Sequence, residues 1–278
     1  MSNQLFSFDD KNLKEEKIDS VSKLIKKIEQ NTKSKKRIYY RGHSEKKYKL
    51  IPSIARFNDF KYLGIEIPPN TNFKEAEKNF LTRFRKHTYE HKGRILSMWE
   101  ALFLARHYEL PVRLLDWSTN PLVALYNATF YEKDEDVKDK DGIIWYFTRK
   151  EYDGQDIDVY NDTDPLNIPG VRLIYPFNPT PKMTAQCSVF TIHQHPWEDL
   201  RYMKKNKYAS QKKPNKNNHL DIKEGGRYVI PYKKKKEIQL DLYKLGINTL
   251  TLHLDLPHIV TGLKQRESIN YLTKPEKI

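Results

Sequence analysis

The sequence predicts an α+β fold with a central mixed or antiparallel sheet and flanking helices. Segments whose apolar residues recur at helical spacing alternate with short segments rich in β-branched and aromatic residues. The 278 residues suffice for one large core or two modest ones. We expect an N-terminal helix and linker over residues 1–36, and one α+β domain over residues 37–278 with a basic insertion near residues 201–236.

The first expected elements are a helix and a strand. Over residues 19–30 four apolar side chains recur at helical spacing between lysines, which predicts an amphipathic helix. Residues 31–36 contain no apolar side chain and are expected to form a linker. Residues 38–40 have the composition of a strand, and Gly42 is expected to end it. Asn72 indicates the start of another helix, because its side chain can accept from first-turn amides.

The middle of the chain predicts a helix, a strand, a tight turn and a second helix. Ser97 and Glu100 have the spacing of a capping box, and the helix that they start should stop before Pro111. Residues 112–117 follow as a strand, and Pro121 suits the first turn of the next helix, where its missing N–H costs nothing. Between this strand and helix, unpaired amides and the helix dipole would favour phosphate.

The remaining apolar segments predict further strands and one more helix. The expected strands span residues 142–147, 187–193 and 226–231. A helix is expected over residues 235–245, and Gly246 follows it at a position that often adopts a left-handed conformation.

Composition restricts the class and compartment of the protein. No uninterrupted apolar stretch approaches the roughly 20 residues of a membrane span, and the N-terminus has no apolar signal core. We therefore expect a soluble, cytoplasmic protein with no membrane partner. The single cysteine, Cys187, excludes an internal disulfide and a Cys-based zinc cluster, and its place in an apolar strand predicts a buried thiol. No metal site is expected.

Positive charge is concentrated in one part of the chain. The net charge is +14, and residues 201–236 hold thirteen Lys or Arg against two acidic residues. Such a patch attracts polyanions, with an affinity that falls steeply as salt rises. We expect nucleic acid to be contacted there by Lys233, Lys234, Lys235 and Lys236. The alternative is a solvated lysine-rich loop in a protein that is rich in lysine throughout.

Residues 106–126 crowd polar chemistry into a segment that otherwise builds core. An Arg, an Asp, a Trp, a His and two hydroxyls are costly to bury unless they pair with one another or face a ligand. This run, with the Tyr-Tyr-Arg-Gly-His of residues 39–43, closely resembles the FRG domain family. The family is named for an aromatic-Arg-Gly tripeptide followed later by a segment of the type A-Q-H-Y-G-L-P-T-R-L-L-D-W-T-x-N-P. The resemblance covers roughly residues 37–191.

The chain also resembles ADP-ribosyltransferases of the arginine-serine-glutamate type. These enzymes carry aromatic-Arg-Gly on their first core strand and a later strand that ends in Ser-Thr before a helix, and residues 40–42 and 117–119 are similar in kind and order. The resemblance implies that Arg41 holds the phosphates or ribose of NAD and that the Ser-Thr pair shapes the nicotinamide pocket. Such a transferase normally needs a carboxylate at the start of a later strand, where this chain has Gln186.

These resemblances imply two sets of site residues. The expected catalytic residues are Arg41, Asp116, Ser118 and Gln186. The residues expected to bind the implied cofactor, NAD, are Tyr40, Gly42, His107, Arg113, Trp117 and Thr119. One cleft is expected to be lined by Tyr40, Arg41, His107, Asp116, Trp117, Ser118 and Gln186.

Structural roles are open for several of these side chains. Arg41 could instead form a structural ion pair with Asp116. Arg113 could be ion-paired inside the fold, with Asp116 or Glu100 as its partner. His107 could pair with Asp116 as a base and its orienter, or it could cap the end of its helix.

The resemblances imply a nucleotide-using function. The first hypothesis is an NAD- or nucleotide-using effector of the FRG family, similar to an ADP-ribosyltransferase, that acts on a nucleic acid or a protein acceptor in bacterial conflict, such as phage defence or a toxin module. The second is a non-catalytic nucleic-acid-binding or sensor module. Gln186 in place of an acid favours the second hypothesis, and Gln186 could also be an ordinary amide at a strand edge. The polar cluster around Asp116 favours an enzyme.

Overall fold

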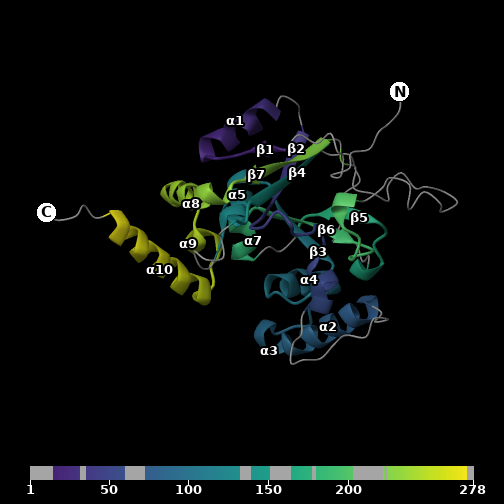
Figure 1. The fold of residues 1–278 in the computed structure, drawn as a ribbon. Helices are drawn as coiled ribbons and strands as arrows, with labels where there is room; N and C mark the ends of the chain where they lie inside the picture. The colour runs from purple at the N-terminus through teal and green to yellow at the C-terminus, as the bar shows by residue number, and fades with distance from the viewer. Residues whose placement is uncertain are drawn as a thin grey trace, which may run out of the picture.

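A computed structural model describes residues 15–31, 36–59, 73–131, 139–150, 164–176, 180–202, 222 and 224–273. At its centre this part of the chain forms a seven-stranded sheet (Figure 1) with the strand order β1-β7-β4-β2-β3-β6-β5. The strands are β1 (Glu16–Lys17), β2 (Lys36–His43), β3 (Leu114–Ser118), β4 (Gly142–Lys150), β5 (Val171–Ile174), β6 (Ser188–His193) and β7 (Glu224–Ile230). β1 pairs with β7 in parallel, and the other neighbours pair antiparallel. The sheet is therefore mixed, and the predicted α+β class is confirmed.

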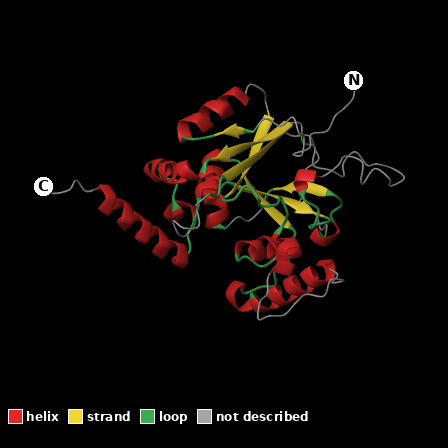
Figure 2. Ribbon diagram, in the orientation of Figure 1, coloured by secondary structure: helices red, strands yellow, loops and turns green. Residues whose placement is uncertain are grey.

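Figure 2 shows the helices in red beside the yellow strands of this sheet. The α-helices are α1 (Val21–Asn31), α2 (Phe73–His87), α3 (Tyr89–Lys92), α4 (Met98–His107), α5 (Pro121–Thr129), α7 (Pro181–Ala185), α8 (Lys235–Lys244), α9 (Thr249–Leu252) and α10 (Leu256–Thr273). Short 3-10 turns lie at Ser53–Asp59, Pro165–Asn167, Leu200–Tyr202 and Tyr232–Lys234. In the described part of the chain, no helix is both long and apolar enough to cross a membrane.

Two helical layers cover different halves of one sheet face. Tyr40 packs in the hydrophobic cluster of α1, α5 and α8, whereas Leu114 packs in the cluster of α2 and α4. Because Tyr40 pairs with Ser118 and side chains alternate along a strand, Tyr40, Ser118 and Leu114 share a face. The opposite face buries Tyr39 and Trp117 with other strand residues. The site described below lies between the two helical layers.

β2 and β3 diverge after a short contact. In the described structure they share one register pair, Tyr40 with Ser118, whereas β2 pairs with β4 along all its residues from Lys36 to His43. The end of β2 therefore has no strand partner on the β3 side. Polar side chains occupy the space that the missing strand pairing leaves.

Most of the predicted elements are confirmed. The helix over residues 19–30 is α1, and the helix over residues 235–245 is α8, which is followed by Gly246 at a φ of 78°. Ser97 and Glu100 form the predicted capping box: the Glu100 amide donates to Ser97 Oγ at 3.1 Å, and the Ser97 amide donates to the Glu100 carboxylate at 2.8 Å. Asn72 lies outside the described residues, directly before α2.

Gly42 does not end its strand, so this expectation was wrong. β2 continues through Gly42 to His43, because β4 supplies partners along its whole length. The glycine is needed for packing: a Cβ at this position would lie 1.9 Å from the carbonyl oxygen of Ala124 in α5. The absent side chain therefore admits the backbone of α5.

The thiol of Cys187 is exposed, which corrects the prediction that it is buried. β6 begins one residue later, at Ser188, and the Cys187 amide donates to the carbonyl oxygen of Thr184 in the turn after α7. Its φ of 48° is left-handed, a conformation typical of turns. The residue therefore belongs to the turn and not to the apolar strand.

The N-terminal elements share the core of the main sheet. β1 pairs with β7, and Ile18, Val21 and Leu24 pack in the same cluster as α5 and α8. Lys36, assigned to the linker from the sequence, lies in β2 opposite Lys150. Residues 32–35 of the expected linker, and most of the basic segment at 203–221, lie outside the described residues.

Candidate functional site

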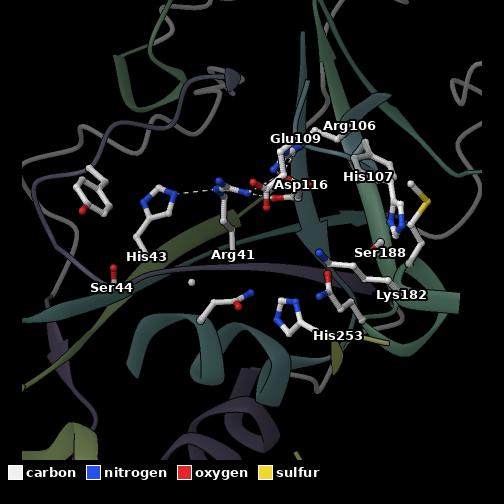
Figure 3. A pocket seen from close by; sticks show the side chains of 16 residues that line it. Arg41, His43, Ser44, Arg106, His107, Glu109, Asp116, Lys182, Ser188 and His253 are labelled. Carbon is white, nitrogen blue, oxygen red and sulfur yellow. Dashed lines mark hydrogen bonds and ion pairs between the residues drawn. The ribbon is translucent and has the colours of Figure 1, made fainter. Parts of the chain in front are cut away.

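A cavity of about 340 Å³ opens where β2 and β3 diverge (Figure 3). One wall comes from the end of β2, from β3 and from the end of α4, and the other comes from α7, the start of β6 and the residue after α9. The charged and histidine side chains of its lining are Arg41, His43, Arg106, His107, Glu109, Asp116, Lys182 and His253. Its volume falls within the range of about 300–1,000 Å³ for small-molecule sites.

Arg41 spans the gap between β2 and β3. Its Nη1 donates to the backbone oxygen of Asp116 at 2.6 Å and lies 3.4 Å from the Asp116 carboxylate. Its Nε donates to Nε2 of His43 at 2.8 Å. Burial lowers the pKa of Arg41 to about 10, although the charge of Asp116 opposes this shift, so Arg41 remains charged at neutral pH. The ion pair that the sequence suggested for Arg41 and Asp116 is confirmed.

Asp116 is shared by two guanidinium groups. Arg106, at the end of α4, donates from Nε at 3.1 Å and from Nη2 at 2.7 Å to the same carboxylate oxygen of Asp116. Burial favours the neutral acid, but the positive charges of Arg106 and Arg41 outweigh it and lower the pKa of Asp116. Asp116 is therefore an anchored carboxylate that holds two arginines at the cavity.

Three histidines line the cavity in their neutral forms. Burial, together with the positive charge of Arg41, holds the pKa of His43 well below its usual value. Burial and the nearby Lys182 lower the pKa of His253 to about 4 and also lower that of His107. The cavity therefore carries its positive charge on arginine and lysine at pH 7, and its imidazole rings act as neutral hydrogen-bonding groups.

The second wall is tied together by hydrogen bonds around Gln186. The side-chain amide of Gln186 donates to the carbonyl oxygen of Leu252 at 3.1 Å, which joins α7 to α9. Ser118 Oγ donates to the carbonyl oxygen of Gln186 at 2.7 Å, which joins this wall to β3. Lys182 Nζ lies 3.9 Å from Asp255 at the start of α10. The amide group of Gln186 is thus part of the scaffold of the wall.

The structure brings together part of the expected cleft. Arg41, Gly42, His107, Asp116 and Gln186 line the cavity. The lining does not include Tyr40, Ser118, Trp117 or Thr119. Tyr40 packs under α5, Trp117 Nε1 donates to Thr191 Oγ1 on the opposite face at 3.1 Å, and Ser118 is buried. Trp117 packs in the hydrophobic cluster on the opposite face of the sheet, together with Tyr39.

His107 and Asp116 do not meet. His107 Nδ1 lies 3.1 Å from Thr180 Oγ1, the N-cap of α7, whereas Asp116 is held by Arg41 and Arg106. The base and orienter pair, one of the two roles that the sequence left open for His107, is therefore not formed. His107 instead links the end of α4 to the start of α7 across the cavity.

Arg113 forms a buried ion pair with Glu77 of α2, and not with Asp116 or Glu100. Its Nε donates to one Glu77 oxygen at 2.7 Å and its backbone amide to the other at 2.7 Å, and the two side chains are 3% and 0% exposed. Glu100 pairs with Arg94 instead. Arg113 therefore lies outside the cavity, and the expectation that it binds a cofactor is corrected.

The amide groups at the start of α5 have partners within the fold. The Asn120 amide donates to Ser118 Oγ at 2.9 Å, the Leu122 amide donates to Asn120 Oδ1 at 2.9 Å, and the Thr119 amide donates to the Cys187 carbonyl at 3.1 Å. The phosphate site expected at this turn is therefore filled by capping groups. At the cavity, the charged side chains of the described residues are therefore the groups suited to an anion.

The lysines expected to contact nucleic acid differ in exposure. Lys233 and Lys236 are exposed, and Lys234 forms an ion pair with Glu237. Lys235 is 1% exposed, and its Nζ donates to the carbonyl oxygen of Ser44 at 2.6 Å. The expected strip of four surface lysines must therefore be corrected for Lys235, whose side chain fixes α8 to the end of β2.

Several lining residues were not singled out from the sequence. Arg106 and Glu109 lie in the recognised motif, at the predicted end of the helix before the strand of Asp116. That position could have indicated that they lie near Asp116. Lys182 and His253 come from segments of ordinary composition and reach the cavity only through the packing of α7 and α9. No group of three or more His, Cys, Asp or Glu suited to a metal occurs among the residues described.

Comparison with known proteins agrees with the resemblance read from the sequence. Residues 36–137 match the family model of the FRG domain. The match includes Arg41, Arg106 and Asp116 but ends before Lys182 and Gln186, so it is shorter than the span of residues 37–191 expected from the motifs. No curated protein and no solved structure matches the chain.

Proposed function

Because the chain carries an FRG domain over residues 36–137, we propose that the cavity binds a phosphate-bearing nucleotide, with NAD as the expected ligand. The observation that carries this proposal is the pair of guanidinium groups, Arg41 and Arg106, fixed at the cavity by one carboxylate. A planar guanidinium donates to two phosphate oxygens at once, and burial strengthens such charge-assisted bonds.

Donor groups remain for such a ligand. Among the described residues, Nη2 of Arg41 and Nη1 of Arg106 have no hydrogen-bond partner, whereas the other donors of these guanidinium groups bind Asp116 or His43. Lys182 adds a third positive charge on the opposite wall. Against these stand the carboxylates of Asp116 and Glu109, so the cavity has a net positive charge that suits a diphosphate.

We further propose that the protein acts on NAD as an ADP-ribosyltransferase-like effector. β2, β3 and β6 are neighbours in the sheet, so the segments that resemble transferase motifs lie on adjacent strands. Gln186 makes a scaffold contact and supplies no charge, so transfer depends on another carboxylate at the cavity. A protein or nucleic-acid acceptor and a role in bacterial conflict belong to the same proposal and rest on the resemblance.

Calorimetric titration with NAD⁺, ADP-ribose and nicotinamide tests the ligand. We expect the protein to bind NAD⁺ and ADP-ribose and expect Arg41→Ala to bind neither. Arg41→Lys should not restore binding, because the ammonium loses the planar fork. Arg94→Ala is the matched control, since Arg94 is exposed and pairs with Glu100 outside the cavity. A protein that binds none of these ligands, or a lysine variant that binds like the wild type, would contradict the proposal.

A second candidate function is the non-catalytic binding of nucleic acid. The exposed Lys233 and Lys236, beside a segment with a large excess of basic residues, favour it. Nucleic acid would then bind independently of the cavity. We expect single-stranded DNA or RNA to bind Arg41→Ala as well as it binds the wild type, and a loss of binding in that variant would place the nucleic acid at the cavity instead.

A further inference from the structure

Glu109 occupies a backbone position that favours glycine. It follows α4, and its φ is 63°. The Leu110 amide donates to the Ala105 carbonyl at 2.9 Å, and the Glu109 amide donates to the Arg106 carbonyl at 3.2 Å. This pair of bonds is the Schellman motif, whose left-handed residue is usually glycine because a side chain there is strained. The FRG motif quoted above also has glycine at this position.

The fold gives no reason for the Glu109 side chain. Glu109 is exposed, and its carboxylate has neither a hydrogen-bond partner nor an ion pair within 4 Å among the described residues. The helix end needs the backbone of this residue only. A glutamate here therefore strains the backbone without supporting the packing of the protein.

The carboxylate nevertheless lines the cavity, near Arg106 (Figure 3). After the dominant effect of Asp116, the charge of Glu109 also helps to raise the pKa of Arg106. Asp116 is already bound by Arg41 and Arg106, so its charge is compensated. Glu109 is thus the lining carboxylate with its oxygens still available to a ligand, on the same cavity as the arginines that suit phosphate.

We propose that Glu109 is a specificity-determining residue, which favours a ligand that carries a positive charge close to its phosphates. This inference rests on the proposed function, and it identifies the oxidised dinucleotide, NAD⁺, as the preferred form. The nicotinamide ring of NAD⁺ is cationic, whereas the ring of NADH is neutral. Arg41 and Arg106 would hold the diphosphate while Glu109 attracts the charged ring.

Titrations of the wild type with NAD⁺, NADH and ADP-ribose test this selectivity. We expect NAD⁺ to bind about three- to tenfold more tightly than NADH, the size expected for one charge pair that solvent partly screens. In Glu109→Gln the two forms should bind equally, with the affinity for ADP-ribose equal to or above that of the wild type. Glu90→Gln, which changes an exposed glutamate of α3 outside the cavity, should keep the preference.

Glu109→Gly is a second variant that removes the carboxylate and should still fold. Glycine relaxes the left-handed position, so this variant should unfold at the same temperature as the wild type or at a higher one, and it should also lose the preference for NAD⁺. An unchanged ratio of NAD⁺ to NADH affinity in both Glu109 variants would overturn the role of Glu109 and leave the proposed function standing. A wild type that binds no dinucleotide and no ADP-ribose would overturn the proposed function itself, and this inference with it.

Discussion

Replacing Glu77 by glutamine should unfold the protein at a much lower temperature without a direct effect on the cavity. Glu77 and Arg113 are 0% and 3% exposed, and Arg113 donates to both Glu77 oxygens at 2.7 Å. Breaking a buried pair by removing one partner costs about 3–5 kcal/mol, because the other charge stays buried and uncompensated. At about 2–4 °C per kcal/mol for a domain of this size, the midpoint should fall by roughly 6–20 °C.

A double variant at Glu77 and Arg113 separates the effect of an uncompensated buried charge on stability from the effect of packing. Burial raises the pKa of Glu77 even though the charge of Arg113 opposes this shift, which indicates a pair that is costly to desolvate. Glu77→Leu combined with Arg113→Met should therefore recover most of the lost stability. The free energy of unfolding of the wild type and of each variant is measured by urea unfolding followed by tryptophan fluorescence. If Glu77→Gln is as stable as the wild type, or if Arg113→Met loses NAD binding while its stability is unchanged, the structural role of Arg113 is refuted.

Four further outcomes are expected. Gly42→Ala should cost about 1–3 kcal/mol or more, because its Cβ would lie 1.9 Å from a backbone oxygen of α5; an unchanged melting temperature would refute this packing. Asp116→Asn should lose less stability in acid than the wild type does. The pKa of Asp116 is lowered in the folded protein, so its carboxylate contributes stability above the unfolded pKa of about 4, and this contribution is lost as the pH falls through the folded pKa. Urea titrations of both proteins at pH 3 and pH 7 measure the difference. Burial lowers the pKa of Lys235 to about 8, so wild-type stability should rise relative to Lys235→Met between pH 8 and about 10.5, and parallel profiles would contradict this. If nucleic acid binds at the start of α8 and the 3-10 turn before it, neutralising Lys233 and Lys236 together should reduce the slope of log affinity against log salt by about 0.7–0.9 for each lost phosphate contact. Fluorescence polarisation measures this slope, and an unchanged slope would exclude these contacts.

Local sequence signals predicted the elements of the fold well. The capping box at Ser97 and the left-handed Gly246 depend on residues close in sequence, and both are confirmed. The end of β2 was predicted wrongly at Gly42, because the strand is extended by pairing with β4, which comes about 100 residues later. The exposure of Cys187 was missed for a related reason: one residue decides whether it belongs to a strand or to the preceding turn.

The candidate site was predicted in part. As with the fold, residues within sequence motifs were recognised, whereas contacts between distant segments were not. Arg41 and Asp116 could be recognised because both stand in motifs, and they do form an ion pair. Arg113 has the same motif context, but its partner Glu77 lies on a helix whose packing the sequence does not reveal. Lys182 and His253 carry no motif and reach the cavity through tertiary packing alone. Pairings between distant segments therefore required the structure.

The position of a bound ligand tests the central claim most directly. A crystal structure of the protein soaked with ADP-ribose should show the diphosphate within hydrogen-bonding distance of Arg41 and Arg106, in the cavity between β2, β3 and α7. Density for ADP-ribose along α8 near Lys233 and Lys236, or an empty cavity at a ligand concentration that saturates binding in solution, would contradict the account.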